Sequence, residues 1–478
     1  AMEPEKAQGQ QCPYLDTIDR TVLDFDFEKQ CSVTLSKQNV YACLVCGKYF
    51  QGRGSKSPAF FHALNDNHYV FIHLTNTKVY CLPDNYEVTD SSLNDIKYAL
   101  DPTYSKEEIA LLGKTTETIR TLDGLEYTPG IVGLNDIKAN TTINVVLQSL
   151  MRVPKLRNYF LQPALYERCH SELLDSFGRL MRRVWSKGLF KAQISPHEML
   201  QAISTDSKKH FRSGTAAEPV EFLSWLLNTM DRKLKPVAGK RSIMRECFGG
   251  EVEVTTYSKK KRKEGDGEQG AEDNHGQEIE DENHMIEGYE APTKARCPFF
   301  FLSLDVPAPP LFASEAEKEI KPQVPLYQLL TKFDGMTQQH VTKTGQKKKY
   351  SITKPPRYLI LQIKRFTRNQ YFVEENRTIV NFPLQELDIS DYCTLDPGQQ
   401  VSTTYDLLAN IRHIDQTEEE LSKTLTKVEG DKVKGTYSAH ILNRADGRWF
   451  EVQDLLVTEA LPALITLSEA YLLIYERR

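Results

Sequence analysis

The stretch GLNDIKANTTINVVLQSL, residues 133–150, decides how the larger part of this chain is organised. Its apolar side chains repeat with the spacing of one helix face, at Ile143, Val146, Leu147 and Leu150. This pattern predicts an amphipathic helix from about Thr141, entered through a polar loop. The free N–H groups and positive dipole end of such a helix lower the pKa of a thiol and stabilise an oxyanion. The stretch therefore has the layout of an active site with a thiol nucleophile, yet it contains no cysteine.

Composition places the chain among globular proteins. It has 478 residues, 40% of them hydrophobic, which favours two or more domains at roughly 100–200 residues each. The net charge of -5 gives no global attraction to nucleic acid, so direct RNA contact is neither supported nor excluded. We find no apolar run of about 18 residues and no secretion signal, which predicts an intracellular protein without a membrane segment.

Three regions follow one another along the chain. Residues 10–101 form a short module rich in cysteine, histidine and aromatic residues, and residues 102–129 are expected to form a helical connector that opens with a Ser-x-x-Glu cap. Residues 130–478 read as helices first and strands later, which indicates an α+β domain. The predicted strands lie in GGEVEVTTY, FFFLSLDVP, RYLILQIKRF, YDLLANIRHI, TYSAHILNR, RWFEVQDLLV and AYLLIYER.

Residues 258–289 interrupt the strands with a run of lysine that gives way to acidic residues. Almost no apolar side chain occurs there, so this segment is expected to be a disordered insertion. Its KKKRK run, from Lys259 to Lys263, is either a solvated loop that aids solubility or a patch for nuclear import or nucleic acid.

A candidate metal site lies in the N-terminal module. Cys43 and Cys46 form a Cys-x-x-Cys pair, and His62 and His68 follow. Two thiolates and two imidazoles close a tetrahedral shell around structural zinc. The alternative is two buried thiols beside unrelated histidines. Four further residues are assigned either to the core or to additional metal, namely Cys12, Cys31, Cys81 and His73.

These residues resemble the zinc finger of ubiquitin proteases, and the larger region resembles the catalytic domain of ubiquitin-specific proteases. The matching stretches of the larger region are GLNDIKANTTINVVLQSL, FFFLSLDVP, KPPRYLILQIKRF, IVNFP, YDLLANIRH, GTYSAHI, RWFEVQD and AYLLIYER. The resemblance implies a papain-like fold that clasps ubiquitin, preceded by the small zinc finger.

The resemblance also implies how many metals are bound. The finger of this family often holds two or three zinc ions, but Thr34, Gln51 and Pro58 stand where a second set would need ligands. At a third site Cys12 and Cys81 match half a shell, and Tyr14 and Asp84 replace the rest. In the larger domain only Cys247 and Cys297 occur where the family carries two Cys-x-x-Cys pairs. One structural zinc, on Cys43, Cys46, His62 and His68, is the expected count.

Every catalytic position of the family is degenerate in this chain. The nucleophile position falls on Thr141, the general base on Thr436 and the orienting acid or amide on Gln453. The oxyanion-supporting amide falls on Asp136, whose carboxylate repels the developing charge. An internal threonine has no α-amine to activate its hydroxyl. We therefore expect a papain-like ubiquitin-specific-protease fold without a catalytic triad, and a protein that is not an enzyme.

Two histidines are candidates to replace the missing base. His440 lies four residues beyond Thr436, roughly 13 Å along a strand and outside the range of proton transfer. His413 ends a neighbouring predicted strand and is expected to be a surface or packing residue.

One branch of the family combines this zinc finger with a protease-like domain that lacks the triad. Three N-terminal stretches are similar to the sequences of that branch, namely CPYLDTIDRTVLDFDFEK, YACLVCGKYFQGRG and YCLPDNYE. The resemblance implies a nuclear scaffold in pre-mRNA splicing that supports the spliceosomal tri-snRNP through contacts with its proteins, including its large RNA helicase. Two rival classes stay open: an inactive receptor for ubiquitin or a ubiquitin-like protein outside splicing, and an active deubiquitinase with an unusual nucleophile.

Overall fold

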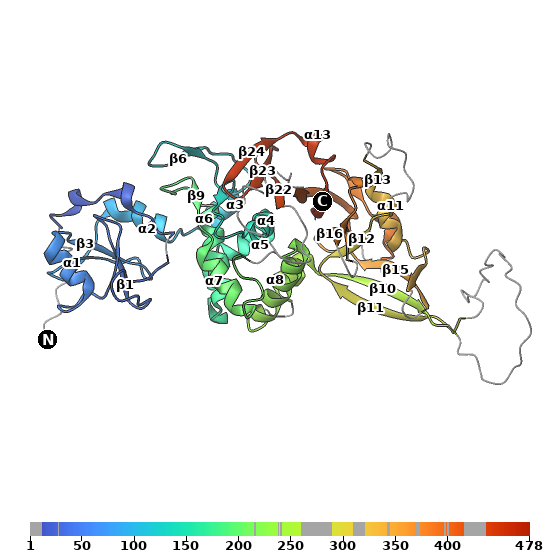
Figure 1. Ribbon diagram of the computed structural model, residues 1–478, viewed down its shortest axis with the longest axis horizontal. Helices are drawn as coiled ribbons and strands as arrows, with labels where there is room; N and C mark the ends of the chain where they lie inside the picture. The colour runs from blue at the N-terminus through green and yellow to red at the C-terminus, as the bar shows by residue number, and fades with distance from the viewer. Residues whose placement is uncertain are drawn as a thin grey trace, which may run out of the picture. The chain divides into compact units, whose positions relative to one another are not determined.

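The computed structural model describes residues 12–26, 28–214, 217–237, 239, 241–259, 289–308, 321–341, 345–368, 373–395, 398, 401–414 and 436–478 (Figure 1). The chain divides into two compact units. Unit 1 comprises residues 1–239 and 437–460, and unit 2 comprises residues 240–436 and 461–478. Apart from Ser258, Lys259 and Tyr289, the predicted insertion at 258–289 lies outside the described residues.

The N-terminal module of unit 1 is built on a five-stranded antiparallel sheet in the order β2-β1-β3-β4-β5. The strands are β1 (Val40–Cys43), β2 (Tyr49–Gln51), β3 (Val70–His73), β4 (Val79–Cys81) and β5 (Tyr86–Val88). Strand alternation gives the sheet two apolar faces. The residues of α2 (Asn94–Leu100) join the core on one face, and those of α1 (Pro58–Asp66) join the core on the other.

The connector is less helical than the sequence predicts. Ser105 and Glu108 do form the expected capping box, but α3 spans only Lys106–Leu111. Gly113 follows with φ +78°, a conformation that ends a helix, and threonines then favour extended backbone. A short hairpin of β6 (Ile119–Arg120) and β7 (Glu126–Tyr127) fills the remainder.

Helices dominate the next part of unit 1, as expected. They are α4 (Thr141–Leu150), α5 (Pro154–Phe160), α6 (Glu172–Val184), α7 (His197–Asp206) and α8 (Pro219–Leu234). The four apolar residues that predicted α4 are all at most 5% exposed, so the helix face was identified correctly. Helix α4 packs against α8 and against β23 (Trp449–Gln453).

Strands complete unit 1. β8 (Gly133–Leu134) pairs in parallel with β9 (Gln193–Ile194), and β23 lies between β22 (Thr436–Leu442) and β24 (Leu456–Ala460). The 3-10 helices of unit 1 are η1 (Leu15–Thr17), η2 (Arg20–Val22), η3 (Ser91–Leu93), η4 (Pro163–Leu165) and η5 (Glu167–Cys169).

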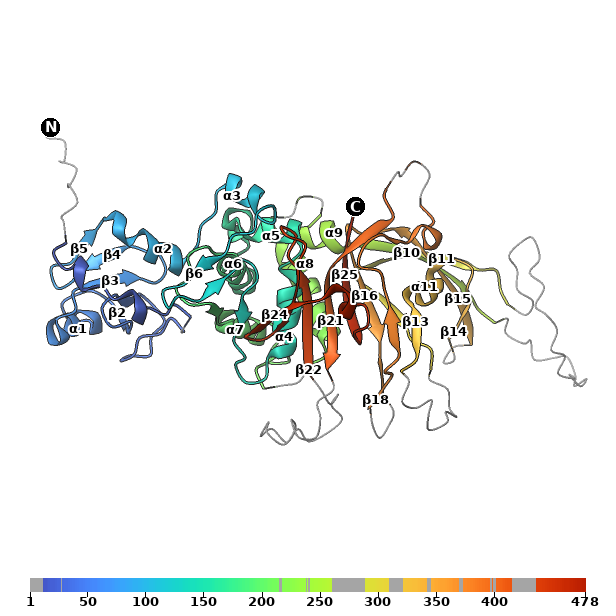
Figure 2. The same ribbon diagram turned by 90° about the horizontal axis from the view of Figure 1, so that it is seen from above.

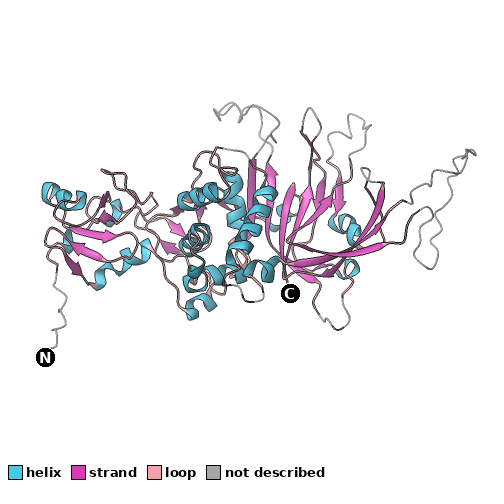
Figure 3. Ribbon diagram, turned by 90° about the horizontal axis from the view of Figure 1, so that it is seen from below, coloured by secondary structure: helices cyan, strands magenta, loops and turns pink. Residues whose placement is uncertain are grey.

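Unit 2 consists mainly of strands, drawn magenta in Figure 3. One group runs β12-β16-β25-β21, with β20 on β21, and a second sheet has the order β11-β10-β15-β14. These strands are β10 (Gly250–Tyr257), β11 (Thr293–Phe299), β12 (Leu302–Asp305), β14 (Gln339–Val341), β15 (Gln346–Lys354), β16 (Tyr358–Lys364), β20 (Leu387–Asp388), β21 (Thr404–Ile414) and β25 (Ala470–Arg477).

The remaining elements of unit 2 are short. They are the pairs β13 (Gln323–Pro325) with β19 (Ile379–Asn381) and β17 (Phe366–Arg368) with β18 (Val373–Glu375), the helices α9 (Ile243–Phe248), α11 (Leu326–Leu330) and α13 (Pro462–Ile465), and the 3-10 helices η6 (Thr331–Phe333) and η7 (Ser390–Tyr392). Helices precede strands along the larger region, which confirms the α+β prediction. Among the described residues, no helix is long and apolar enough to span a bilayer.

Candidate functional site

The four predicted metal ligands come together in the N-terminal module. Cys43 ends β1, and Cys46 follows on a tight turn closed by the hydrogen bond from the Gly47 N–H to the Cys43 carbonyl, 2.9 Å. Gly47 has φ +73°, which only glycine adopts without strain. Helix α1 supplies His62, and the chain leaves this helix directly before His68. The turn and the helix end therefore aim four donor side chains at one point.

The distances within this cluster suit zinc. One donor atom from each of the four residues lies within 4.8 Å of all the others. His62 Nε2 lies 3.4 Å from Cys46 Sγ and 3.1 Å from His68 Nδ1. A tetrahedral zinc with bonds of about 2.0–2.3 Å has ligand-to-ligand edges of roughly 3.3–3.8 Å. The four donors thus need only small shifts to close a structural site.

Hydrogen bonds around the cluster prepare it for a cation. The Asp66 carboxylate lies 2.5 Å from His62 Nδ1, so it orients the ring and directs Nε2 toward the other donors. The hydrogen bond between the two thiols lowers the pKa of Cys46 to about 4 and raises the pKa of Cys43, so Cys46 is the thiol that ionises first. Cys43 and His62 are both buried. The residues present therefore fit one zinc ion.

Two residues that we predict to stand at a second metal position of the finger bond to each other. The Thr34 hydroxyl donates to Gln51 Oε1 at 2.8 Å, and the N–H groups of Val33 and Thr34 point to Cys31 Sγ at 3.4 Å. Pro58 begins α1. These contacts hold the loop around Cys31 without a complete donor set.

The predicted catalytic helix begins with an unexpected carboxylate contact. Thr141 is the first residue of α4, and its hydroxyl donates to Asp454 Oδ2 at 2.6 Å. Asn144, one turn further along, donates to Asp454 Oδ1 at 2.7 Å. Asp454 follows directly after β23 with φ +51°. One carboxylate therefore ties the start of α4 to the turn after β23.

The loop before α4 contains two residues in a strained backbone conformation. Lys138 and Ala139 have φ +62° and +56°, which costs about 1–2 kcal/mol for each non-glycine residue. Asp136 and Asn140 stabilise the loop, because the Asp136 carboxylate accepts the Asn140 N–H at 2.8 Å and the Asn140 side chain accepts the Ile137 N–H. The entrance to the helix is therefore fixed by polar contacts even though no thiol is present.

The electrostatics of this position oppose a second negative charge. Burial raises the pKa of Asp454, and the nearby Asp136 carboxylate raises it further. The hydrogen bonds from Thr141 and Asn144 act in the opposite direction without cancelling the rise. An oxyanion at the start of α4 would thus develop close to two carboxyl groups.

The other two positions that we predict to match the family's triad lie at strand ends. Thr436 is the first residue of β22 and Gln453 the last residue of β23. His440 is buried on β22, where its Nε2 atom lies 3.8 Å from the Glu451 carboxylate on β23. The sequence analysis did not identify Asp454 or its contact with Thr141. The signal was an acidic residue directly after a strand.

His413 was predicted to be a surface or a packing residue, and the structure shows that it is a packing residue. It is 2% exposed, and its Nδ1 atom lies 2.7 Å from the Glu375 carboxylate. Glu469 completes a group of three possible donors in unit 2, of which His413 is buried and the two glutamates are half-buried. The fully buried Arg365 donates to the backbone carbonyls of Thr378 and Ala470 and adds a positive charge near both carboxylates. This group therefore balances charge inside unit 2.

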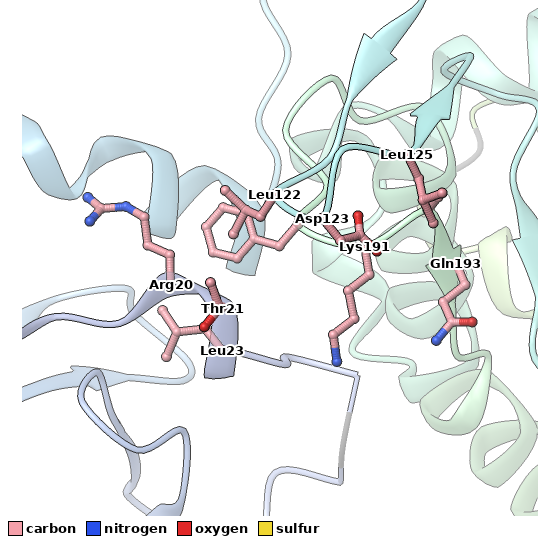
Figure 4. Close-up of a pocket in the computed structure, with 10 residues that line it drawn as sticks. Arg20, Thr21, Leu23, Leu122, Asp123, Leu125, Lys191 and Gln193 are labelled. Carbon is pink, nitrogen blue, oxygen red and sulfur yellow. The ribbon is translucent and has the colours of Figure 1, made fainter.

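A pocket of about 280 Å³ occurs in unit 1 (Figure 4). Its lining is Arg20, Thr21, Leu23, Leu122, Asp123, Leu125, Phe190, Lys191, Ala192 and Gln193. The Lys191 ammonium pairs with Asp24 at 2.6 Å. This mixture of aliphatic and oppositely charged groups offers no nucleophile or metal-binding set.

Two family descriptions match the chain. Residues 132–475 match "Ubiquitin carboxyl-terminal hydrolase", and residues 30–93 match "Zn-finger in ubiquitin-hydrolases and other protein". The first range contains Thr141, Thr436 and Gln453, and the second contains all four proposed zinc ligands.

Individual relatives resemble the chain over nearly its whole length. "Ubiquitin carboxyl-terminal hydrolase 39" of Homo sapiens is 45% identical over 100% of this chain and 82% of its own. "Probable mRNA-splicing protein ubp10" of Schizosaccharomyces pombe is 38% identical over 97% and 88%, respectively. A solved structure described as "Crystal structure of an essential yeast splicing factor" is 28% identical, covers 97% of this chain and 99% of its own, and superposes with a TM-score of 0.73. The chain belongs to the ubiquitin carboxyl-terminal hydrolase family and carries that family's type of zinc finger.

Proposed function

We propose that this chain is a non-catalytic component of the nuclear pre-mRNA splicing machinery. It supports the assembly or stability of the spliceosomal tri-snRNP through contacts with its proteins, including its large RNA helicase. Relatives named for splicing and similar over nearly the full chain favour this role. The single observation that carries the non-catalytic part is the Thr141 hydroxyl, bonded to Asp454 at the position of the family's nucleophile.

Two features oppose catalysis at Thr141. A hydroxyl is a weak nucleophile unless a well-matched base removes its proton, and a carboxylate such as Asp454 is a poor match because its proton affinity is far below that of an alkoxide. Asp136 and Asp454 also place carboxyl groups where an oxyanion would need hydrogen-bond donors. The retained loop and helix thus keep the shape of the family's active site without its chemistry.

The zinc ion has a structural role in this proposal. Cys43, Cys46, His62 and His68 would hold one ion, and four protein ligands leave no open coordination position for a reacting group. Bound zinc would supply folding energy to a module whose two small cores surround five short strands.

Depletion followed by rescue tests the proposed function. Cells that lack the endogenous protein receive wild type, Cys46→Ser, Thr141→Ala or Cys297→Ser, and are scored for intron retention and for tri-snRNP sedimentation. Cys297 is exposed on β11 and serves as the matched cysteine control. We expect Cys46→Ser alone to fail. Full rescue by Cys46→Ser together with failure of Thr141→Ala would overturn the scaffold proposal and point to chemistry at Thr141.

A further inference from the structure

A second pocket of unit 1, of about 90 Å³, is lined largely by the connector. Figure 2 shows α3 of the connector beside α5 and α6. The Arg157 side chain on α5 donates to the Leu112 carbonyl at 3.2 Å, and the Tyr104 hydroxyl donates to the Arg182 carbonyl on α6 at 2.6 Å. We call this site the connector pocket. Its lining includes Tyr98, Leu111, Leu112, Trp185 and Asn443.

Two N–H donors of the lining have no hydrogen-bond partner among the residues that the structure describes. They are Trp185 Nε1 and Asn443 Nδ2, and both atoms are buried. Trp185 is only 7% exposed, and the guanidinium groups of Arg152 and Arg157 lie 4.6 and 4.5 Å from the centre of its ring. The Asn443 amide is oriented, because its Oδ1 atom accepts the Ala445 N–H at 3.3 Å. Buried donors usually have a partner, so both groups favour an acceptor from outside the chain.

The charges around the connector pocket oppose a ligand of either sign. The two guanidinium groups beside Trp185 oppose a cation. Two carboxylates, those of Glu108 and Glu117, line the pocket together with one ammonium, that of Lys187, which pairs with Glu117 at 2.6 Å. These carboxylates oppose an anion. The lining therefore favours an uncharged group.

An amide satisfies this lining better than either ion does. Its oxygen can accept from Trp185 Nε1 and from Asn443 Nδ2. Its NH₂ group can donate to Glu108, whose carboxylate also accepts the Ser105 N–H at 2.7 Å and has further lone pairs. A carboxylate ligand has no donor and an ammonium ligand has no acceptor, so neither can bond to both kinds of group.

The size of the connector pocket fits one short side chain. Its 90 Å³ correspond to about three water molecules at roughly 30 Å³ each, whereas cofactor sites measure roughly 300–1,000 Å³. Tyr98, Leu111 and Leu112 supply apolar surface for a stem. Leu111 is 57% exposed, so a partner can reach this wall from solvent. The volume thus excludes a cofactor and admits a side chain with a short stem and a polar tip.

We propose that the connector pocket receives one glutamine side chain of a partner protein. The methylene groups of this side chain contact the apolar wall at Leu111 and Leu112, and its amide replaces water at Trp185 and Asn443. The connector is thereby part of a binding site and not only a link between domains. This inference is independent of the splicing role, since it concerns binding by the isolated chain.

The indole N–H signals of the three tryptophans test the proposal. Nuclear magnetic resonance spectra of the full chain with ¹⁵N-labelled tryptophan are recorded as propionamide is added, because this molecule reproduces the stem and the amide of glutamine. The Trp185 signal is assigned by its absence in Trp185→Phe. We expect it to move downfield, as a hydrogen-bonded proton does, and to saturate at millimolar propionamide, while the signals of Trp225 and Trp449 stay in place.

A matched pair of asparagine variants locates the binding. Asn443→Asp keeps the shape and the acceptor for Ala445 but replaces the NH₂ donor with an oxygen, so it should weaken propionamide binding about tenfold. Asn228→Asp makes the same change on α8, where the exposed Asn228 donates to the Ser224 carbonyl, and should leave the affinity unchanged. If Asn443→Asp does not fold, Leu111→Ser on the exposed wall replaces it and should weaken binding about threefold.

Three results would overturn the proposal. A Trp185 signal that does not shift in an otherwise intact spectrum would show that the connector pocket holds water only. Tighter binding of propionate or of propylammonium than of propionamide would assign the connector pocket to an acidic or a basic side chain. Equal affinities of wild type and Asn443→Asp would remove Asn443 from the site.

Discussion

The zinc-ligand cluster and the start of α4 differ in how far their side chains suit the chemistry that the family's sequence pattern implies. In the cluster, Cys43, Cys46, His62 and His68 form a complete donor set around one point. At the start of α4, the hydroxyl of Thr141, the residue that we predict at the nucleophile position, donates to Asp454. The comparison teaches that a site can hold its local backbone in two ways, through a complete donor set around one point or through hydrogen bonds between side chains.

The second metal position of the finger supports this interpretation on a smaller scale. The hydrogen bond between Thr34 and Gln51 spans positions where metal ligands would be needed. At both positions, hydrogen bonds between side chains join the local segments. The difference between a retained site and a replaced site should therefore appear as a difference in stability when each is broken.

The largest effect is expected from breaking the zinc cluster. Cys43→Ser, or removal of metal with a chelator, should unfold the N-terminal module, because structural zinc contributes about 10 kcal/mol or more of folding free energy. Limited proteolysis should then cut the module and spare the larger region. Metal analysis of wild type should give about one zinc per chain. Cys31→Ser is the matched control and should leave the metal content unchanged, while a chelated protein that resists proteolysis like wild type would refute the prediction.

A smaller but clear loss is expected from breaking the contact at α4. Asp454→Ala removes two hydrogen bonds to a carboxylate and places alanine at φ +51°, so it should lower the free energy of unfolding by about 3 kcal/mol. Asp454→Asn should cost much less, since asparagine tolerates this backbone conformation and keeps one acceptor oxygen. Chemical denaturation compares the two variants. Equal stability of both would mean that the contact does not stabilise the fold.

The pH dependence of this site has a definite sign. Because burial raises the pKa of Asp454, the folded protein holds this proton more tightly than the unfolded chain does. The stabilising contribution of the group is present below the ordinary aspartate pKa of about 4 and is lost as the pH rises through the folded-state pKa. Asp454→Asn should therefore gain stability relative to wild type as the pH increases across this window. A difference in stability that stays constant with pH would contradict the assignment.

The smallest effect is expected at the replaced metal position of the finger. Thr34→Ala removes one exposed hydrogen bond to Gln51 and should cost at most about 1 kcal/mol, measured as a small decrease in the unfolding midpoint. The zinc content should not change. Loss of zinc in this variant would show that Thr34 supports the retained cluster and that the two positions are coupled.

Local sequence patterns were sufficient to predict elements whose residues follow a fixed spacing along the chain. The spacing of Ile143 and Leu147 predicted α4, and the spacing of two cysteines and two histidines predicted a cluster that the structure brings together. These signals work because helix periodicity and metal coordination each impose a fixed pattern.

Contacts between distant segments could not be read from such patterns. Asp454 meets Thr141 across more than three hundred residues, and no local rule identifies that partner. The connector was predicted to be helical, but Gly113 and the threonines after it end α3 early.

Turnover of a fluorogenic ubiquitin C-terminal substrate tests the central claim, that the family's fold persists here without its chemistry. Wild type, Thr141→Ala and Thr141→Cys are compared at equal concentration, with an active ubiquitin-specific protease as the positive control. We predict no hydrolysis above buffer for any of the three, because the Thr436 position supplies no base and Asp136 and Asp454 oppose an oxyanion. Wild-type hydrolysis that disappears in Thr141→Ala would contradict the account.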